Sequence, residues 1–335
     1  MSTQRKIVFD AIGSVTTEQY DDPHAALEPG QVRVAAKYIG ICGSDLHVLA
    51  GGHPFAQPPT VPGHEICAEV TEVGPEVEGV EVGDHVVVDP IMACGHCRAC
   101  LAGRYNLCEP PMVAGFRAPG FGRTSQVVPA RNLHIAPRDL PWQVLAFAEP
   151  ATCARHCVGR LPESARENVL VIGAGTIGLS VIQALRIMGA GQITSVDLDP
   201  TKRQLAATLG ADRTFAPGEL DPAETFTGVI DVVAAQATLT EACTRVVAGG
   251  TVVVMGVPSG PREIPLPSMQ RFERDLVSSG MYVPSDFADA IAWLADGRFD
   301  AARLVTDVFS LEDAPKAYAR AQEPDSIKVL ISLSD

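Results

Sequence analysis

The sequence predicts an α/β protein with a β-rich first domain and a second domain built on a doubly wound parallel sheet. In the first half, short segments of alternating polarity, such as residues 31–37 and 67–73, are separated by glycine and proline. That pattern is typical of half-buried strands. From about Glu167 onward, apolar strand-like segments alternate with helical segments, and a glycine loop separates the first strand from the first helix. This alternation is typical of a parallel sheet with crossover helices.

The elements of the second half follow from their residue patterns. Nearly continuous apolar runs predict buried parallel strands at residues 168–172, 192–196, 229–234 and 251–255. Apolar residues at helical spacing predict helices at residues 176–188, 202–209, 286–295 and 311–321. Ser310 with Asp313 three residues later predicts a capping box at the start of the last helix. A final strand is expected at residues 327–333.

The length of 335 residues is sufficient for two domains that each bury a core. We expect residues 1–152 to form the first domain, with a lobe at about residues 90–110, and residues 153–284 to form the second. Residues 285–335 are expected to return to the first domain, because a closing strand this late in a chain often pairs with the first strands.

The composition is that of a soluble globular protein, with 46% apolar and 20% charged residues. The formal net charge of −14 argues against a nucleic-acid partner and against an anionic membrane surface. No apolar run reaches the length of a membrane span, and no basic start followed by an apolar segment indicates a signal peptide. We therefore expect a cytoplasmic protein that acts on a small molecule, with no nucleic-acid and no membrane partner.

Four of the nine cysteines form a closely spaced series in a turn-rich stretch. Two residues separate the first pair, two the second pair and seven the third, in the order Cys94, Cys97, Cys100 and Cys108. Four thiolates at such spacing can converge on one tetrahedral Zn²⁺, and a site closed by four protein ligands is structural. The odd number of cysteines in a chain without a secretion signal favours metal binding over disulfides. We expect buried small side chains at Cys67, Cys153, Cys157 and Cys243.

A dinucleotide-binding fingerprint follows the strand at residues 168–172. Its three glycines provide a tight turn, close approach of a pyrophosphate and close helix–strand packing, and the helix N-terminus attracts the phosphates. Asp197, nineteen residues after Gly178, is placed to bind a ribose diol and to repel a 2′-phosphate, which predicts NAD over NADP. Lys202 and Arg203 follow closely and leave NADP open. The expected cofactor-binding residues are Gly173, Gly175, Thr176, Ile177, Gly178, Asp197 and Lys202.

With two more motifs, the chain resembles the zinc-dependent medium-chain dehydrogenase/reductase family, which includes alcohol, polyol and threonine dehydrogenases. The motifs are Cys42-Gly-Ser44-Asp45-Leu-His47 and Gly63-His64-Glu65, and with the cysteine series and the fingerprint they stand in the family's order. The resemblance covers nearly the whole length. It implies a GroES-like catalytic domain that is interrupted by a Rossmann domain.

The resemblance also implies a catalytic zinc in addition to the structural one. Cys42 and His64 match its ligands, and the third ligand is either Glu149 or Glu65, an alternative that stays open. A thiolate, an imidazole and a carboxylate leave one position open, as catalytic zinc sites do. Zinc at that site is a Lewis acid that lowers the pKa of the substrate alcohol.

Other residues match supporting positions of the family. Ser44 matches the hydroxyl that touches the substrate oxygen, and His47 matches the outer base of the proton relay. Asp45 is expected to accept a hydrogen bond from His64, and Lys328 matches a basic residue near the pyrophosphate or the metal-site glutamate. The loop residues expected to line the substrate pocket are His53, Phe55, Val113 and Phe116.

Three segments depart from the family pattern. Ala68 stands where relatives have glycine, and Ala235-Gln236-Ala237-Thr238 replaces their Glu-Ala-x-Gly. Met281-Tyr282-Val283 lacks the Phe-Arg-Tyr run of polyol dehydrogenases, which argues against a sorbitol-like substrate.

We therefore expect an enzyme that transfers a hydride between an alcohol and NAD, with two zinc ions per chain. The alcohol is expected to be secondary, such as a sugar alcohol, an amino alcohol or a natural-product intermediate. One alternative is a carbonyl reductase of secondary metabolism that uses NAD(P)H, and another is a non-catalytic, zinc-stabilised NAD-binding sensor or scaffold. The family forms dimers or tetramers, so a homodimer or homotetramer is expected, paired through the region of residues 251–258 and 261–267.

Overall fold

The computed structural model describes residues 4–21, 26–109, 112–258 and 260–334. It divides into two compact units. The first comprises Met1–Glu149, Val283–Asp296 and Ala301–Asp335, and the second comprises Pro150–Tyr282 and Gly297–Asp300. The expected division at residues 152 and 284 differs from this one by a few residues, and no residue pattern indicated that Gly297–Asp300 belongs to the second unit.

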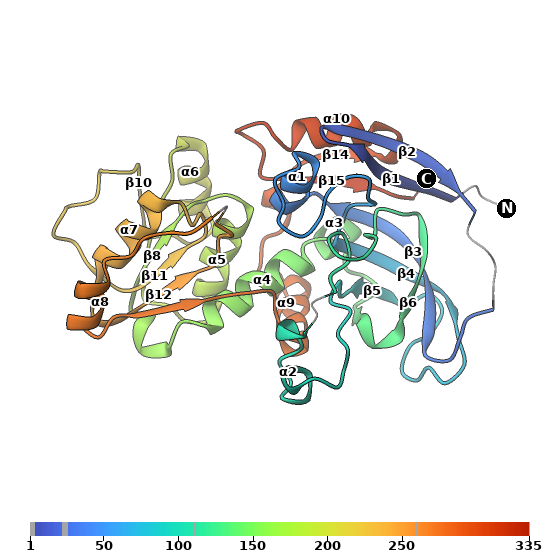
Figure 1. The fold of residues 1–335 in the computed structure, drawn as a ribbon, viewed down its shortest axis with the longest axis horizontal. Helices are drawn as coiled ribbons and strands as arrows, with labels where there is room; N and C mark the ends of the chain where they lie inside the picture. Colours follow the sequence, from blue (N-terminus) through green and yellow to red (C-terminus); the bar gives the residue numbers. More distant parts are fainter. Residues whose placement is uncertain (1–3, 22–25, 110–111, 259, 335) are drawn as a thin grey trace. The chain divides into compact units, whose positions relative to one another are not determined.

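The first unit contains one large sheet and a separate two-stranded sheet formed by the first two strands of the chain (Figure 1). The strands of the large sheet are, in spatial order, β14 (Val305–Ser310), β15 (Lys328–Ser332), β3 (Gln31–Gly40), β4 (Glu65–Val73), β5 (His85–Val88) and β7 (Leu133–Ala136), with β6 (Ser125–Pro129) also paired to β3. The two-stranded sheet consists of β1 (Gln4–Ala11) and β2 (Ser14–Tyr20). Because β15 pairs antiparallel with β3, the last strand of the chain lies beside one of the first.

The core of this unit lies between the inward faces of the strands, as the alternating pattern requires. Val32, Val34 and Ala36 of β3 are buried together with Ile66, Ala68 and Val70 of β4. Ala68, which replaces the family's glycine, is fully buried and pairs with Ala36. The helices of the unit are α1 (Gly43–Leu49), α2 (Arg98–Leu101), α3 (Trp142–Leu145), α9 (Pro284–Ala295) and α10 (Ala314–Arg320). A further helix, α4 (Ala148–Gly159), begins in the first unit and continues into the second.

The last of these helices begins differently from the expected capping box. Residues Leu311–Asp313 form a 3-10 turn, α10 begins only at Ala314, and Ser310 makes no side-chain cap. Proline in the first turn of α10 explains the later start, because proline is accommodated at the first helical positions and not further inside.

The second unit is a six-stranded parallel sheet. Its strands are, in spatial order, β10 (Arg213–Phe215), β9 (Gln192–Val196), β8 (Asn168–Ile172), β11 (Phe226–Asp231), β12 (Val246–Val254) and β13 (Asp275–Ser278). The order reverses between β8 and β11, as in a doubly wound fold, so this prediction is confirmed. The helices are α5 (Thr176–Ile187), α6 (Pro200–Thr208), α7 (Gln236–Arg245) and α8 (Leu266–Arg271). Among the described residues, no helix is long and apolar enough to cross a membrane.

Candidate active site and metal centres

Cys42 lies in the turn between β3 and α1, two residues after the end of the strand. Its backbone is extended, and its amide donates to Asp45 Oδ2 at 3.0 Å. The Ser44 hydroxyl, in the first turn of α1, lies 3.1 Å from Cys42 Sγ. The short helix therefore holds the thiol, a hydroxyl and a carboxylate close together.

His64 immediately precedes β4 and is 5% exposed. Gly63 before it has φ +97°, and a Cβ there would lie 2.1 Å from Ile39 Cδ1, so only glycine allows this turn. Asp45, which is 1% exposed, places Oδ1 3.5 Å from His64 Nδ1. The two atoms face each other at ion-pair distance, but the expected hydrogen bond from His64 to Asp45 is not formed.

The surroundings of His64 favour positive charge. Burial alone lowers its pKa, but the nearby Asp45 carboxylate and Cys42 thiol outweigh it and hold the pKa well above the ordinary value. A position that attracts a proton also attracts a metal cation, which replaces that proton on binding. The electrostatics therefore fit a metal ligand at His64.

Glu65 begins β4 and forms a buried ion pair with the first residue of β15. Lys328 Nζ donates to Glu65 Oε1 at 2.8 Å, to Oε2 at 2.6 Å and to the Ile41 carbonyl at 3.1 Å. Burial lowers the pKa of Lys328, but the charges of Glu65 and Cys42 raise it above its usual value, so the ammonium stays charged. Glycine at position 40 leaves room for the Glu65 carboxylate in this position, because a Cβ there would lie 2.1 Å from Glu65 Oε2.

Cys42, His64 and Glu65 offer ligand atoms that all lie within 4.8 Å of one another. Glu149, at the start of α4, is outside this group; it is 4% exposed, and its charge acts on Lys328. Three buried carboxylates thus share the region with one ammonium, because Asp45 is buried there too. Buried negative charge of this kind is costly unless a cation balances it. The donor set and the charge both fit a divalent metal.

His47 lies three residues after Ser44 and is exposed, and Ser44 is half-buried. Within the part of the chain that the structure describes, no hydrogen bond joins the Ser44 and His47 side chains. His47 instead acts on His53, whose pKa is lowered by burial and then by the charge of His47, against a smaller raising effect of Asp45. The structure therefore places His47 near the loop that carries His53.

Three of the four expected pocket residues meet beside His64. The Phe116 ring lies 5.0 Å from the His64 ring and stacks on His53 at 4.6 Å, and His53 contacts Phe55 edge-on at 5.9 Å. Val113 instead forms an isolated bridge with Ile91.

Sequence reasoning missed Arg117, whose guanidinium covers the Phe55 ring at 4.6 Å. Its position directly after Phe116 was the available signal, since arginine commonly stacks on aromatic rings.

The cysteine series forms a second candidate metal centre. The sulfurs of Cys94, Cys97, Cys100 and Cys108 lie within 4.8 Å of one another. Zn–S bonds of about 2.3 Å in a tetrahedron imply S–S separations of about 3.8 Å. The Cys94 and Cys100 sulfurs are 3.9 Å apart, which matches. Backbone hydrogen bonds from Cys100 and Glu109 lower the pKa of Cys97 to about 6, whereas at Cys108 a hydrogen bond from the Cys94 amide is outweighed by burial and by the thiols of Cys94 and Cys100, which raise the pKa to about 12.

A hydrogen bond that the sequence did not predict connects the cysteine lobe to the large sheet. The Tyr105 hydroxyl, between the third and fourth cysteines, donates to the buried Asp89 carboxylate just after β5. The other oxygen of Asp89 accepts from the Ile91 amide at 2.8 Å. This hydrogen bond therefore ties the lobe to the residue that follows β5.

The glycine fingerprint has the expected geometry in the second unit. Gly175 is the N-cap of α5, and Thr176 and Ile177 form its first turn. A Cβ on Gly178 would lie 1.9 Å from the Gly173 carbonyl oxygen, so the close approach requires glycine there.

Asp197 directly follows β9 and faces the glycine loop. Its Oδ2 accepts from the Ala174 amide at 2.6 Å and its Oδ1 from the Asp199 amide at 2.8 Å. Arg203 donates to the carbonyls of Asp197 and Leu198, whereas Lys202 is half-buried in the first turn of α6. The Arg203 guanidinium therefore binds backbone carbonyls of the loop that follows β9.

Family models agree with this geometry. Residues 28–138 match the alcohol dehydrogenase GroES-like domain, and residues 176–296 match the zinc-binding dehydrogenase domain. The Escherichia coli K12 starvation-sensing protein RspB is 32% identical over 91% of this chain and 93% of its own length. The chain belongs to the zinc-dependent medium-chain dehydrogenase/reductase family.

Other relatives are oxidoreductases on alcohols and polyols. Sorbitol dehydrogenase of Bacillus subtilis is 32% identical over 90% of both chains. A zinc-binding dehydrogenase of Sinorhizobium meliloti, solved with NADP, has a TM-score of 0.91 at 28% identity and covers 99% of this chain and 100% of its own. An Escherichia coli CFT073 alcohol dehydrogenase, solved with NADH, has the same TM-score, identity and coverage. One of these two solved neighbours thus holds NADP and the other NADH.

Proposed function

We propose that this protein is a zinc-dependent alcohol dehydrogenase that transfers a hydride between a secondary hydroxyl group and NAD. The observation that carries the proposal is the convergence of half-buried Cys42 with buried His64 and Glu65, next to the rings of Phe116 and His53. Three mixed ligands leave one zinc position for substrate, which distinguishes a catalytic site from the four-cysteine site.

Cys42 and His64 would hold the catalytic zinc, together with Glu65 or Glu149. Of the two glutamates, Glu65 has the support of its position within 4.8 Å of the other ligand atoms. The four-cysteine group would hold the structural ion. When bound, the catalytic zinc supplies Lewis acidity that lowers the pKa of the substrate hydroxyl.

The chain's own residues orient the ligands and carry the proton. Asp45 holds His64 from the Nδ1 side and leaves Nε2 for the metal. Lys328 holds both oxygens of Glu65 and so fixes the direction of its carboxylate. Ser44 would take the proton of the substrate hydroxyl while its own hydroxyl proton passes to a bridging water, and the exposed His47 would accept a proton from that water and release it to solvent.

Asp197 supports NAD as the cofactor. Its carboxylate, fixed by two amides beside the glycine loop, keeps lone pairs free for a ribose diol and repels a 2′-phosphate. Lys202 would contact the ribose or phosphate from α6.

The substrate is proposed to be a polyhydroxylated secondary alcohol. Relatives named for sorbitol and L-galactonate support this class, while Met281-Tyr282-Val283 argues against sorbitol itself. The carbonyl reductase alternative uses the same site in the opposite direction, and the neighbour solved with NADP supports it. The sensor alternative has one observation in its favour, the name of the relative called a starvation-sensing protein.

We also propose a homodimer or homotetramer. β13 is the edge strand of the second unit's sheet, and Leu276 on it is 39% exposed. Val257 and Leu266, in the two segments expected to pair, are 71% and 61% exposed, which suits an apolar contact between copies.

The test is initial rates with NAD and NADP over a panel of sugar alcohols, aldonates, amino alcohols and simple secondary alcohols, in both directions. We expect turnover of at least one polyol with NAD. Faster reduction of ketones with NADPH would favour the reductase, and binding of NADH without turnover of any alcohol or ketone would favour the sensor.

A further inference from the structure

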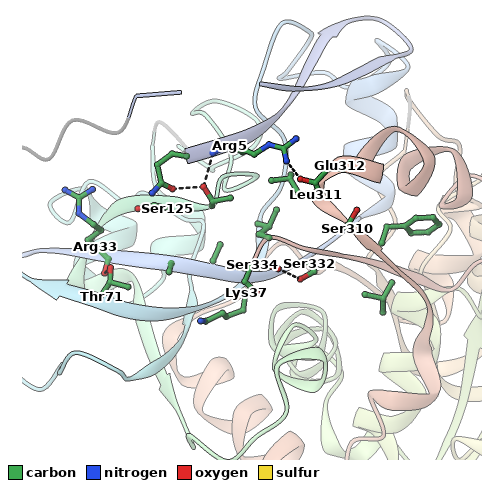
Figure 2. Close-up of a pocket in the computed structure, with 17 residues that line it drawn as sticks. Arg5, Arg33, Lys37, Thr71, Ser125, Ser310, Leu311, Glu312, Ser332 and Ser334 are labelled. Atoms are coloured by element: carbon green, nitrogen blue, oxygen red, sulfur yellow. Dashed lines mark hydrogen bonds and ion pairs between the residues drawn. The ribbon is translucent and has the colours of Figure 1, made fainter. Parts of the chain in front are cut away.

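The cations that line one large groove of the first unit are all paired with carboxylates. The groove has a volume of about 710 Å³ and is bounded by β1, β3, β14 and β15. Figure 2 shows Arg5 next to Glu312, its ion-pair partner, and Arg33 and Lys37 are likewise paired. The candidate active site differs, because it contains a polar ring atom, Nε2 of His53, that makes no hydrogen bond among the described residues.

A local hydrogen bond fixes the tautomer of the His53 ring. The Phe55 amide donates to His53 Nδ1 at 3.2 Å, so the neutral ring carries its hydrogen on Nε2. Burial, followed by the charge of His47, lowers the pKa of His53, which favours this neutral form at pH 7. Nε2 of the half-buried His53 is therefore a hydrogen-bond donor.

Aromatic contacts hold the His53 ring in place. The ring stacks on Phe116, with centroids 4.6 Å apart and an interplanar angle of 18°, and it contacts Phe55 edge-on at 5.9 Å. Arg117 covers the Phe55 ring at 4.6 Å, so two consecutive residues of one turn hold both rings of the 53–55 loop. A donor that is held in this way loses little conformational freedom when it binds a ligand.

The turn that carries Phe116 packs directly against the segment before His64. Gly115 has φ +86°, and a Cβ on it would lie 3.1 Å from the Gly63 carbonyl oxygen. The same carbonyl accepts from the Phe121 amide at 2.9 Å. The Phe116 ring also lies 5.0 Å from the His64 ring. One aromatic side chain thus contacts both the proposed metal ligand and the donor ring, and it sets the separation between them.

We propose that His53 Nε2 donates a hydrogen bond to a second oxygen atom of the substrate and so selects secondary alcohols that carry a further hydroxyl group. The inference rests on the proposed function, because the reacting hydroxyl is placed at the metal that His64 would hold. The Phe116 ring would pack against the carbon chain between the two oxygen atoms. His53 is in this account a specificity-determining residue.

The test compares alcohols of one carbon skeleton, with the zinc-loaded enzyme and NAD. The substrates are 2-pentanol and the diols 2,3-, 2,4- and 1,4-pentanediol, in which the second hydroxyl lies one, two or three carbons from a secondary alcohol. We expect kcat/KM for at least one diol to exceed that for 2-pentanol about tenfold, the contribution of one hydrogen bond. The gain is expected mainly in KM, because this hydrogen bond is made before as well as during the reaction.

Two substitutions of His53 separate this role from a role in the loop alone. In His53→Asn, the side-chain oxygen can still accept from the Phe55 amide, but the Nε2 donor is lost. In His53→Gln, an amide N–H reaches the Nε2 position, but the acceptor for the Phe55 amide is lost. We expect His53→Asn to lower the ratio of kcat/KM for the preferred diol to that for 2-pentanol about tenfold, and His53→Gln to retain most of this ratio.

His85→Phe is the matched control. It removes another half-buried imidazole of the first unit that contacts a ring, that of Trp142 at 3.8 Å, and His85 is on β5. We expect the control to keep the diol preference of the wild type.

Nitrogen-15 NMR of the histidine rings gives a readout that does not depend on turnover. With NADH bound, a diol can bind without reacting, and the preferred diol is expected to shift the His53 Nε2 resonance more than 2-pentanol does. The proposal would be overturned if no diol were preferred over 2-pentanol, if His53→Gln lost the preference while His53→Asn kept it, or if the Nε2 resonance did not move. These results leave the dehydrogenase activity in place, whereas the absence of turnover with every alcohol and ketone contradicts the proposed function itself.

Discussion

Lys328 donates to both carboxylate oxygens of Glu65, at 2.8 and 2.6 Å, across a separation of 263 residues. The two side chains are 2% and 1% exposed, so neither charge has access to water. The pair connects the last strand of the chain to the segment that carries His64.

Removal of one partner leaves an unpaired buried charge. Lys328→Met and Glu65→Gln are each expected to lower the free energy of unfolding by about 3–5 kcal/mol. The double variant is expected to be less destabilised than the sum of the two, with a coupling of about 0.5–3 kcal/mol. Denaturant unfolding in excess chelator measures this without a contribution from metal binding. Additive effects would show that the two charges do not depend on each other.

Gly40→Ala tests how closely the strand approaches Glu65. Its Cβ would lie 2.1 Å from Glu65 Oε2, so the carboxylate must move away from the Cys42 and His64 ligand atoms. We expect a loss of dehydrogenase activity of at least about 100-fold, the usual effect of a small displacement at a reacting centre. Gly43→Ala is the control, because nothing lies within 4 Å of its added Cβ. Equal activity of the two variants would contradict this role of Gly40.

Asp197→Asn tests the cofactor preference. Loss of the negative charge removes a charged hydrogen bond to the ribose and the repulsion of a 2′-phosphate. We expect the ratio of kcat/KM for NAD to that for NADP to fall about tenfold or more. Asp199→Asn is the control, since asparagine preserves the N-cap of α6 while it removes a charge from the same loop. A similar fall in the control would assign the effect to general electrostatics of the loop.

Tyr105→Phe tests the contact between the cysteine lobe and the sheet. The buried Asp89 carboxylate loses a donor, which costs about 1–3 kcal/mol. We expect faster release of one zinc to a chelating dye. Tyr20→Phe also removes a tyrosine hydroxyl that donates to a buried residue, but Tyr20 is on β2, outside the lobe. Identical zinc release from the two variants would remove the role of Tyr105.

Features with local spacing were predicted well. The glycine fingerprint, the four cysteines and the strands 168–172 and 192–196 each depend on residues close in the sequence, and the structure has these strands at the same bounds. Two strands of the second sheet were missed. β10 has only three residues, and β13 is largely exposed, so neither produces a buried apolar run.

Contacts between segments that are distant in the chain could not be predicted from the sequence. The proximity of Glu65 to Cys42 and His64 and its pairing with Lys328 depend on how β4 and β15 come together, and no periodicity encodes that arrangement. The Tyr105–Asp89 hydrogen bond and the cation–π contact of Arg117 are likewise tertiary. The resemblance supplied the role of the site residues, whereas the structure supplied their partners.

The most direct test of the two-metal account is the zinc content of the wild type and of Cys42→Ala, with activity measured on the same samples. We expect two zinc ions per chain in the wild type. Cys42→Ala is expected to retain one ion, bound by the four cysteines, to show a nearly unchanged thermal midpoint and to have no dehydrogenase activity. Two zinc ions in Cys42→Ala, or activity with only one ion in the wild type, would contradict the account.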